Sequence, residues 1–500
     1  MDFPTIIAGF QDALTLTNLM FVVAGVVLGQ IVGAMPGIGP IMTMAIAIPF
    51  TFVLGPLSAI SFLVGVNKGG LIGGAIPAIL INTPGTPDAA ATALDGFPLA
   101  RKGKPVKALK MALYSSVTGD TFSDLVLITV SAPLAIIALK MGPVEIFSVM
   151  VFAFAVISGM IGSSVARGIF AAALGLFCAT VGLDPQHATP RLIFGFFDLY
   201  DGFPIGAVAI GSLAVSEILA RIATPGLASR PAVSIPKNQS REDRGVSLSE
   251  YLSCKFVLLR GALIGTTIGA IPGMGSTAAA FMSYASTKQS SKEPEKFGTG
   301  ELKGIAATES ANSSVAGADF IPLLTLGLPG SAAAAIMIGA FIIQGIQPGP
   351  LLFSEQGRLV YGMFCAMVMA NAANLLVGLF GLRLWSIIAT APSSIVFASA
   401  LSLCAAGVYI ASGGFVGIWV MVMFAFLGLV MMAMDIPVVV FIIAFFLGPR
   451  FELSLVQTSI ILRGDMTRLT NHPVAILFLV MSVLVVYWLG FHNRRKQQSA

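Results

Sequence analysis

Long apolar runs separated by short polar connections occupy most of the chain. A helix of about 20 apolar residues crosses a bilayer, so the chain has room for about 10 to 12 transmembrane segments. The first runs cover about 16–35 and extend to Phe52 and Val66, later ones lie near 111–139, 144–163, 165–182 and 204–220, and others follow from about 256. This pattern predicts an all-α polytopic membrane protein without a sizeable soluble domain.

Composition strengthens this prediction. The 500 residues are 56% hydrophobic and 10% charged, with a mean hydropathy of +0.92, which excludes a soluble globular protein. The four cysteines form no Cys-x-x-Cys pair, so neither a disulfide framework nor a zinc site is indicated. The net charge of +5 comes from basic residues in loops, which indicates membrane topology and no nucleic-acid partner. The N-terminus lacks the basic region of a signal peptide, so we expect the first apolar segment to remain.

A polar break interrupts the apolar run from Leu71 to Leu94. It reads Asn-Thr-Pro-Gly-Thr over Asn82–Thr86, and its apolar arms are too short to span the bilayer separately. Proline removes a backbone donor and glycine admits positive φ, so the run should form a broken-helix or re-entrant hairpin. Such a break survives in lipid only where protein surrounds it or where it lines a wet cavity. The alternative is a Pro-Gly turn that serves packing alone.

The chain contains an internal repeat. The glycine-rich stretch that starts at Gly29 returns at Gly265, 236 positions later, with six of twelve positions identical. Ile76–Thr86 returns as Ile321–Ser331 at an offset of 245, with its Pro-Gly pair retained. Two such breaks predict that each repeat carries one hairpin, as in transporters that bind substrate between inverted repeats.

The distribution of charge predicts the orientation of the repeats. Residues 1–67 contain no Lys or Arg, whereas five basic residues lie within 101–110 and a long basic connection covers 221–260. By the positive-inside rule the basic loops are cytoplasmic, so the two repeats should enter the membrane from opposite faces. The N-terminus is then periplasmic, and Arg494-Arg495-Lys496 places the C-terminus in the cytoplasm. We expect three regions, namely the first repeat with accessory helices at 1–220, a cytoplasmic loop at 221–255, and the second repeat with accessory helices at 256–500.

Several motifs together carry a family resemblance. They are Gly33–Pro40, the Asn82–Gly85 hairpin leading into Ala93–Pro98, Glu309–Asn312, Ile321–Ser331, a mid-chain segment within Asp184–Glu217, and Leu447-Gly448-Pro449. In these motifs the chain resembles the large membrane subunit of tripartite tricarboxylate transporters, the TctA family, over nearly its whole length.

The resemblance implies an ion-driven importer of a di- or tricarboxylate in the bacterial inner membrane. It also implies two partners, a small TctB-like membrane subunit and a periplasmic TctC-like binding protein that delivers the substrate. It implies no cofactor beyond a coupling cation, Na⁺ or H⁺.

The residues themselves suggest how an organic anion is held. The N-terminal end of a half-helix carries free N–H groups and a partial positive charge, so the two Pro-Gly turns can bind carboxylates. The apolar run to Val66 is followed by Asn67-Lys68-Gly69-Gly70, which we expect to be a polar interruption between two apolar segments. Lys68 is the only basic residue among the first 100 and is a further candidate, although this segment could instead be a loop end from which Lys68 extends to lipid headgroups. The predicted substrate-binding residues are Lys68, Asn82, Thr83, Pro84, Gly85, Thr86, Ser310, Asn312, Thr325, Pro329, Gly330 and Ser331.

The glycine-rich turns are candidates for a cation site, because unwound backbone carbonyls can coordinate Na⁺. The predicted cation-binding residues are Gly37, Gly39, Thr43, Gly273, Gly275, Ser276 and Thr277, with simple helix ends as the alternative. Asp88, Glu309 and Asp319 are acids near the hairpins that could bind a cation or proton, or could pair with neighbouring polar groups.

Catalytic functions find no support in the sequence. It lacks a His-Glu-x-x-His motif, a P-loop and a nucleophile elbow, so we expect gradient coupling and no enzyme activity. The main alternative to a carrier is an ion or solute channel or a structural scaffold subunit, and the remote one is an intramembrane enzyme.

Overall fold

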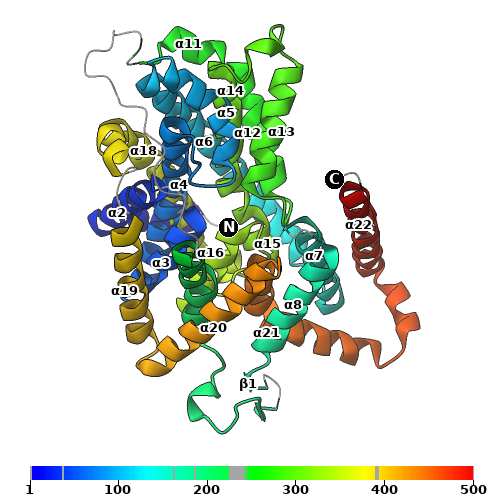
Figure 1. The fold of residues 1–500 in the computed structure, drawn as a ribbon. Coiled ribbons are helices and arrows are strands. Elements are labelled where there is room, and N and C mark those ends of the chain that lie inside the picture. The colour runs from blue at the N-terminus through cyan, green and yellow to red at the C-terminus, as the bar shows by residue number, and fades with distance from the viewer. Residues whose placement is uncertain are drawn as a thin grey trace.

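A computed structural model describes residues 3–35, 39–161, 164–184, 187–223, 243, 245–388 and 393–498. Helices make up almost all of it, and one two-stranded antiparallel sheet joins β1 (Gly182–Leu183) to β2 (Pro190–Arg191). Figure 1 shows the helices arranged around the central α4 and α16, with α22 at one side, where its Phe478 packs against Phe152 of α7. The prediction of an all-α membrane protein is therefore confirmed.

The first half contains both short and long helices. They are α1 (Phe3–Ala13), α2 (Leu16–Gly33), α3 (Pro40–Thr51), α4 (Pro56–Ile81), α5 (Ala89–Arg101), α6 (Pro105–Ala138), α7 (Pro143–Ile161), α8 (Val165–Ala179), α9 (Ile205–Ala209) and α10 (Ser216–Ala223), with the π-helical η2 (Ile210–Val215) joining the last two.

The second half also contains short and long helices. They are α11 (Leu248–Ser253), α12 (Lys255–Gly269), α13 (Gly275–Gln289), α14 (Leu302–Ala318), α15 (Phe320–Leu326), α16 (Ala332–Ile343), α17 (Leu352–Glu355), α18 (Gly357–Ile388), α19 (Ser393–Ala411), α20 (Phe415–Ala433), α21 (Val438–Leu462) and α22 (Pro473–Gln498). Three 3-10 turns, η1 (Phe197–Leu199), η3 (Pro294–Lys296) and η4 (Met466–Asn471), lie in the connections.

Within the described residues, eight helices are long and apolar enough to cross a membrane, and five shorter apolar helices accompany them. The short ones include α3, which follows the glycine-rich turn after α2, and α16, which follows the second Pro-Gly break. An exact number of crossings stays a prediction, since length and composition alone do not fix it.

Glycines set the closest helix contact of the first half. Gly25, Gly29 and Gly33 lie on one face of α2, directly against the backbone of α4. A Cβ built on Gly33 would come within 2.6 Å of the Gly70 carbonyl oxygen. Small residues allow this approach, which a bundle in lipid uses for dispersion contact.

The segment Asn67-Lys68-Gly69-Gly70 lies inside α4, so the expected polar interruption between two apolar segments is wrong. Its glycines serve the packing against α2 instead.

The second half reproduces this contact. Gly261, Gly265 and Gly269 of α12 lie against α14, and a Cβ on Gly269 would come within 2.9 Å of the Val315 carbonyl oxygen. Gly33 and Gly70 match Gly269 and Val315 at the sequence offsets of 236 and 245, so the repeat extends from sequence to packing.

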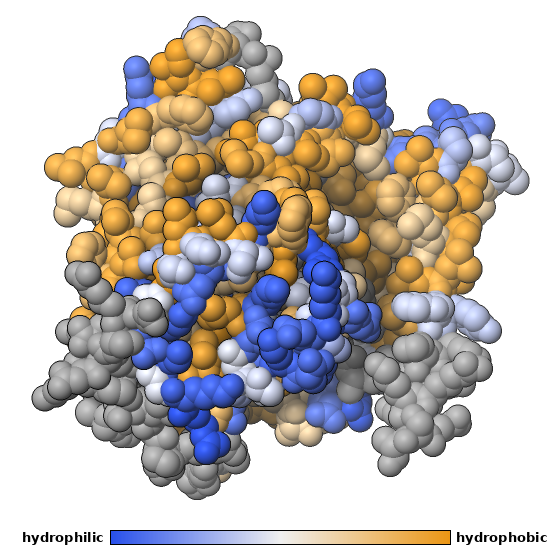
Figure 2. Space-filling view, turned by 90° about the horizontal axis from the view of Figure 1, so that it is seen from above, coloured by the Kyte–Doolittle hydropathy of each residue, from blue (hydrophilic) through white to orange (hydrophobic). Residues whose placement is uncertain are grey.

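One end of the molecule gathers charged loops. Figure 2 shows hydrophilic side chains collected on this end, and the residues around 101–103, 288–290 and 292–296 are exposed. Lys104 forms an ion pair with Asp243 at 2.9 Å, and Lys107 pairs with Glu250. The basic loops predicted to share one face therefore do meet, although residues 224–242 of the connecting loop lie outside the described part.

A different set of segments meets around the loop between α3 and α4. The Gln344 side chain, just after α16, donates to the Thr51 carbonyl at 2.7 Å, and Arg358 at the start of α18 pairs with Asp12 of α1. The hairpin of β1 and β2 projects from the helical body beyond α8 and α21 (Figure 1). Arg191 on β2 anchors it through a bidentate pair with Glu452 of α21, at 2.6 and 3.1 Å.

Candidate functional site

The first Pro-Gly segment terminates α4 through a left-handed residue. Asn82 has φ 52° and ψ 33°, and the Thr83 N–H donates to the Pro77 carbonyl at 3.3 Å. This hydrogen bond joins residues six positions apart, one more than the six-to-one bond of a Schellman cap. The helix therefore ends two residues before Pro84, so the break depends on Asn82 as well as on the predicted Pro-Gly pair.

The second segment ends its helix with matching geometry. Gly327 has φ 72° and ψ 26°, and the Leu328 N–H donates to the Pro322 carbonyl at 3.2 Å. Gly327, Leu328 and Pro322 lie 245 positions after Asn82, Thr83 and Pro77. Two helix ends with equivalent donors and acceptors are therefore built by one repeated sequence pattern.

A hydroxyl residue starts the helix after each break. The Thr86 oxygen accepts from the Ala89 N–H at 3.2 Å, and the Ser331 oxygen accepts from the Ala334 N–H at 3.2 Å. Both bonds join a residue to the third one after it, as an N-cap does. Thr86 and Ser331, predicted as substrate donors, thus accept from an N–H at the start of α5 and α16, and the Ser331 hydroxyl itself donates to Asp319.

Each Pro-Gly turn lies against the glycine-rich turn of its own repeat. A Cβ on Gly85 would come within 2.9 Å of the Gly33 carbonyl oxygen, and one on Gly330 within 2.7 Å of the Gly269 carbonyl oxygen. The Gly273 N–H also donates to the Gly330 carbonyl at 2.8 Å. The structure thus brings the predicted cation-binding turns next to the predicted substrate-binding turns.

The individual cation candidates differ in position. Gly39 precedes α3 and accepts the Thr43 hydroxyl at 2.9 Å, while Gly275, Ser276 and Thr277 begin α13. Gly37 lies outside the described residues. These segments are helix ends, as the alternative expected, and a cation role for them stays a prediction.

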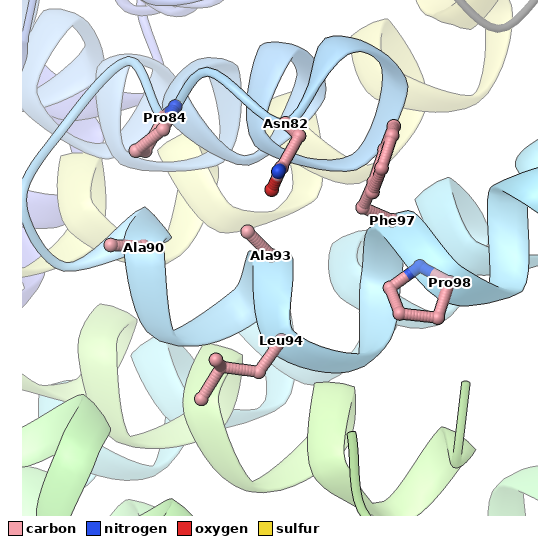
Figure 3. A pocket seen from close by; sticks show the side chains of 7 residues that line it. All are labelled: Asn82, Pro84, Ala90, Ala93, Leu94, Phe97 and Pro98. Carbon is pink, nitrogen blue, oxygen red and sulfur yellow. The ribbon is translucent and has the colours of Figure 1, made fainter. Parts of the chain in front are cut away.

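A cavity of about 310 Å³ adjoins the first turn. Asn82 and Pro84 line one side of it, and Ala90, Ala93 and Leu94 of α5 line the other (Figure 3). This volume falls in the range of small-molecule sites. The space beside the second turn is far smaller, with about 10 Å³ lined by Thr325, Leu328 and Arg450 among others.

Arg450 is a residue that the sequence analysis missed. It follows Pro449 inside α21, and its Nη1 donates to the Pro348 carbonyl at 2.8 Å. Its guanidinium carbon lies 3.1 Å from the position of a Cβ on Gly327, so the cation touches the second helix break. The adjacent Leu-Gly-Pro motif was the sequence signal that could have found it.

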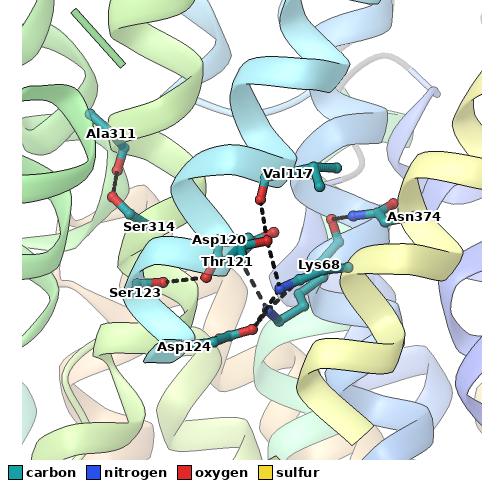
Figure 4. A network of polar contacts seen from close by, with 10 residues as sticks. Lys68, Val117, Asp120, Thr121, Ser123, Asp124, Ala311, Ser314 and Asn374 are labelled. Carbon is teal, nitrogen blue, oxygen red and sulfur yellow. Dashed lines mark hydrogen bonds and ion pairs between the residues drawn. The ribbon is translucent and has the colours of Figure 1, made fainter. Parts of the chain in front are cut away.

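Lys68 lies at the centre of a buried polar network (Figure 4). Its Nζ lies 2.7 Å from Asp124 Oδ2, 3.4 Å from Asp120 Oδ1 and 2.7 Å from Asn371 Oδ1. Only 1% of the lysine is exposed, so its expected alternative position at a loop end, reaching lipid headgroups, is wrong. Its ammonium is occupied by α6 and α18, and a contact with substrate stays a prediction.

Amides extend this network to a second helix pair. The Asn374 amide donates to the Lys68 carbonyl at 3.1 Å, and Gln30 of α2 donates to the Asn374 side chain at 2.6 Å. The network therefore joins α2, α4, α6 and α18.

The acids near the hairpins are buried among neutral polar groups. Asp88 lies beside Thr86, Ser276 and Asn312. Glu309 accepts from Ser116 at 2.7 Å and from Thr92, and Asp319 accepts from the Ser331 hydroxyl. The expected alternative, pairing with neighbouring polar groups, therefore describes Glu309 and Asp319.

Two other predicted substrate-binding residues lie within helices, Ser310 in α14 and Thr325 in α15. Ser310 packs toward Gly119 of α6 and Gly261 of α12, while Thr325 donates to the Ile321 carbonyl at 2.7 Å.

Asp95 was overlooked as a structural acid. Its Oδ1 accepts from the N–H groups of Gly298, Gly300 and Glu301, each at 2.8 Å, and Tyr284 donates to its Oδ2 at 2.9 Å. Asp95 thus fixes the loop before α14 of the second repeat onto α5 of the first.

Comparison with known proteins gives one family. The model of the tripartite tricarboxylate transporter TctA family matches residues 19–443. A protein of Agrobacterium vitis described as an uncharacterized 52.8 kDa protein in the TAR-I ttuC' 3'region is 33% identical over 486 residues, covering 96% of this chain and 94% of the relative. A second from the same organism, in the TAR-II ttuC' 3'region, is 34% identical over 222 residues, which cover 44% of this chain and 92% of the relative. No solved structure matches. The chain belongs to the tripartite tricarboxylate transporter TctA family, whose members are multi-pass membrane subunits of transporters with further subunits.

Proposed function

We propose that this chain is the subunit that carries substrate through a secondary importer of the bacterial inner membrane. Its substrate is a di- or tricarboxylate, a citrate-like organic anion, which enters with a coupling cation, Na⁺ or H⁺. A TctC-like periplasmic binding protein delivers the substrate and a TctB-like small subunit completes the complex. The substrate lies between the Pro-Gly turns at Asn82–Thr86 and Gly327–Ser331.

The observation that carries this proposal is the matching construction of the two turns. Each ends one helix at a left-handed residue and has a hydroxyl that accepts from an N–H at the start of the next helix. Gly85, Thr86 and residues 327–330 are buried, whereas Asn82 is exposed. A break of this kind costs free energy at membrane depth unless it serves a polar ligand or cavity. The 310 Å³ cavity beside Asn82 and Pro84, together with Arg450 beside Gly327, supports a carboxylate as the ligand.

An opposite orientation of the repeats is part of the proposal. The loop between α3 and α4 contacts the end of α16 through Thr51 and Gln344. In the second repeat, the loop between α13 and α14 contacts α5 through Asp95. The connection inside each repeat thus meets the helix that follows the other repeat's Pro-Gly turn, at the C-cap residue Gln344 of α16 and at Asp95 in the middle of α5, which supports inverted repeats and alternating access between them. In this arrangement the N-terminus is periplasmic and the C-terminus cytoplasmic.

A channel is the competing function, and flux distinguishes the two. We expect saturable uptake of one carboxylate in vesicles that contain this chain, its small subunit and the binding protein. Uptake should rise after a sodium or proton jump and should stop when the binding protein is omitted. The measurement uses a panel of labelled mono-, di- and tricarboxylates. Flux proportional to substrate concentration and indifferent to the ion gradient would overturn the carrier.

A further inference from the structure

The region around Asp88 joins the first hairpin to the second repeat. Asp88 precedes α5, Ser276 lies in the first turn of α13, and Asn312 lies in the middle of α14. The side chains of Thr86, Ser276 and Asn312 lie within hydrogen-bonding reach of the Asp88 carboxyl. Four oxygen-bearing side chains from both repeats therefore surround one point.

Polar atoms at this point lack partners. Asp88 is 4% exposed and Asn312 is 1% exposed, yet Oδ2 of Asp88 and both Oδ1 and Nδ2 of Asn312 form no hydrogen bond of normal geometry. An unpaired buried amide destabilises the fold because its lost hydration is not replaced, and an unpaired carboxylate does so more strongly. The arrangement is therefore incomplete without a ligand that these oxygens can bind.

The charge of the surroundings indicates a cation. In the described part of the chain, the buried acids that form ion pairs with a lysine are Asp120 and Asp124, while none of the ion pairs involves Asp88. The nearby Glu309 already accepts from Thr92 and Ser116. An ionised carboxylate buried in low dielectric needs a positive partner, and no side chain among the described residues supplies one to Asp88.

The donor set favours a monovalent ion. Carboxylate, amide and hydroxyl oxygens are ligands for hard cations. Within the described residues, no group of three or more His, Cys, Asp or Glu could hold a metal ion. One carboxylate with neutral oxygens balances a single positive charge, whereas a divalent ion would leave excess charge in the interior.

We propose that Asp88, Asn312 Oδ1, Ser276 Oγ and Thr86 Oγ1 form a sodium site between the two repeats. The repeat-equivalent positions of Asp88, Asn312 and Ser276 are Ala333, Asn67 and Pro40, so the carboxylate and one hydroxyl occur in one copy alone. The proposed site therefore has no equivalent residue set at the matching position of the other repeat. Glycine-rich turns supply Ser276 but need not provide the ligands by themselves.

The site also gives a route for coupling, and this part rests on the proposed function. Thr86 belongs to the first Pro-Gly turn, so an ion held by Asp88 and Asn312 ties that turn to the second repeat. An ion that stabilises the substrate turn must raise carboxylate affinity by the same factor by which the carboxylate raises ion affinity.

Thermal unfolding tests the site without substrate or partners. The full chain in lipid nanodiscs is unfolded at increasing sodium chloride, with choline chloride keeping the ionic strength constant. Bound sodium raises the unfolding midpoint saturably. We expect this rise in the wild type, its loss in Asp88→Asn, and an apparent Kd at least tenfold weaker in Asn312→Ala and in Ser276→Ala. Ser276 is partly exposed, so its variant keeps the test valid if Asp88→Asn does not fold.

Asp95→Asn is the matched control, because Asp95 is a buried acid whose two carboxylate oxygens already accept from backbone N–H groups and from Tyr284. It should keep the saturable sodium response. A wild type without that response, or retention of it in both Asp88→Asn and Ser276→Ala, overturns the site. If carboxylate uptake depends on sodium but these variants still bind sodium, the proposed function stands and the sodium site proposed here is wrong. If the wild type binds sodium at this site but takes up no carboxylate, the sodium site stands and the proposed function is wrong.

Discussion

The two Pro-Gly turns share a backbone but differ in the chemistry around them. Asn82 and Gly327 both end a helix with positive φ, and Thr86 and Ser331 both cap the next one. Around the first turn lie a 310 Å³ cavity and the Asp88 cluster, whereas the second turn is closed against Arg450 and Asp319. The two repeats therefore share the backbone geometry of the turn, while the side chains around it differ between the two halves.

The largest expected effect concerns Lys68, whose repeat-equivalent position is Ser313. Lys68→Met leaves Asp120 and Asp124 buried without a cation, and removing one partner of such a pair costs about 3 to 5 kcal/mol. We expect little folded protein by size-exclusion chromatography, with partial recovery when Asp124→Asn is added. Ser313→Ala is the control and should behave like wild type. A Lys68→Met protein as stable as wild type would show that the network is dispensable.

Glycine contacts at the two turns come next. Gly85→Ala and Gly330→Ala each place a methyl group against backbone, at 2.9 Å from the Gly33 oxygen and 2.7 Å from the Gly269 oxygen. Overpacking of this size costs about 1 to 3 kcal/mol. We expect a lower unfolding midpoint and at least a tenfold loss of uptake in both variants. Gly55→Ala meets nothing within 4 Å and is the control. Normal uptake in both would separate the turns from transport.

The helix caps before the turns should respond unequally. Gly327→Ala puts a Cβ on a left-handed residue, which costs about 1 to 2 kcal/mol, and also directs it toward the Pro348 oxygen at 2.7 Å. Asn82→Gly keeps the left-handed conformation accessible and should change the free energy of unfolding little. Thermal unfolding of the pair measures the difference. Equal destabilisation would contradict the equivalence of the two caps.

The smallest effects are expected at the N-caps. Thr86→Ala removes one cap and should cost about 1 kcal/mol. Ser331→Ala removes the same bond and also the hydroxyl that Asp319 accepts, so it should cost more. Chemical or thermal unfolding of both single variants checks the order. The reverse order would show that the hydrogen bond between Ser331 and Asp319 does not stabilise the second turn.

Periodicity and repeats predicted much of this architecture because they depend on local sequence. The apolar runs gave most of the helices, and the alignment of Ile76–Thr86 with Ile321–Ser331 located both breaks. The stretch at Lys68 was misjudged, because a polar segment beside two glycines looks like a loop when its partners lie far away in sequence. Asp120, Asp124 and Asn371 make that segment a buried helix.

Side-chain roles at the site were less accessible to sequence reasoning. Thr86 and Ser331 lie at the predicted breaks and their substrate role stays a prediction, whereas the hydrogen bonds that they accept from N–H groups of α5 and α16 are visible only with the backbone in place. Arg450 and Asp95 act on loops more than 100 positions away, at Pro348 and at Gly298. No local pattern announces such long-range partners, so the tertiary fold was needed to find them.

Equilibrium binding of the transported carboxylate to two double variants tests the central claim most directly. One carries Pro84→Ala with Gly85→Ala, and the other carries Pro329→Ala with Gly330→Ala, both purified as full chains that have inserted into membranes. A site shared by the two turns predicts at least a hundredfold weaker binding in each variant than in the wild type. Wild-type affinity in both variants would contradict a substrate site between the Pro-Gly turns.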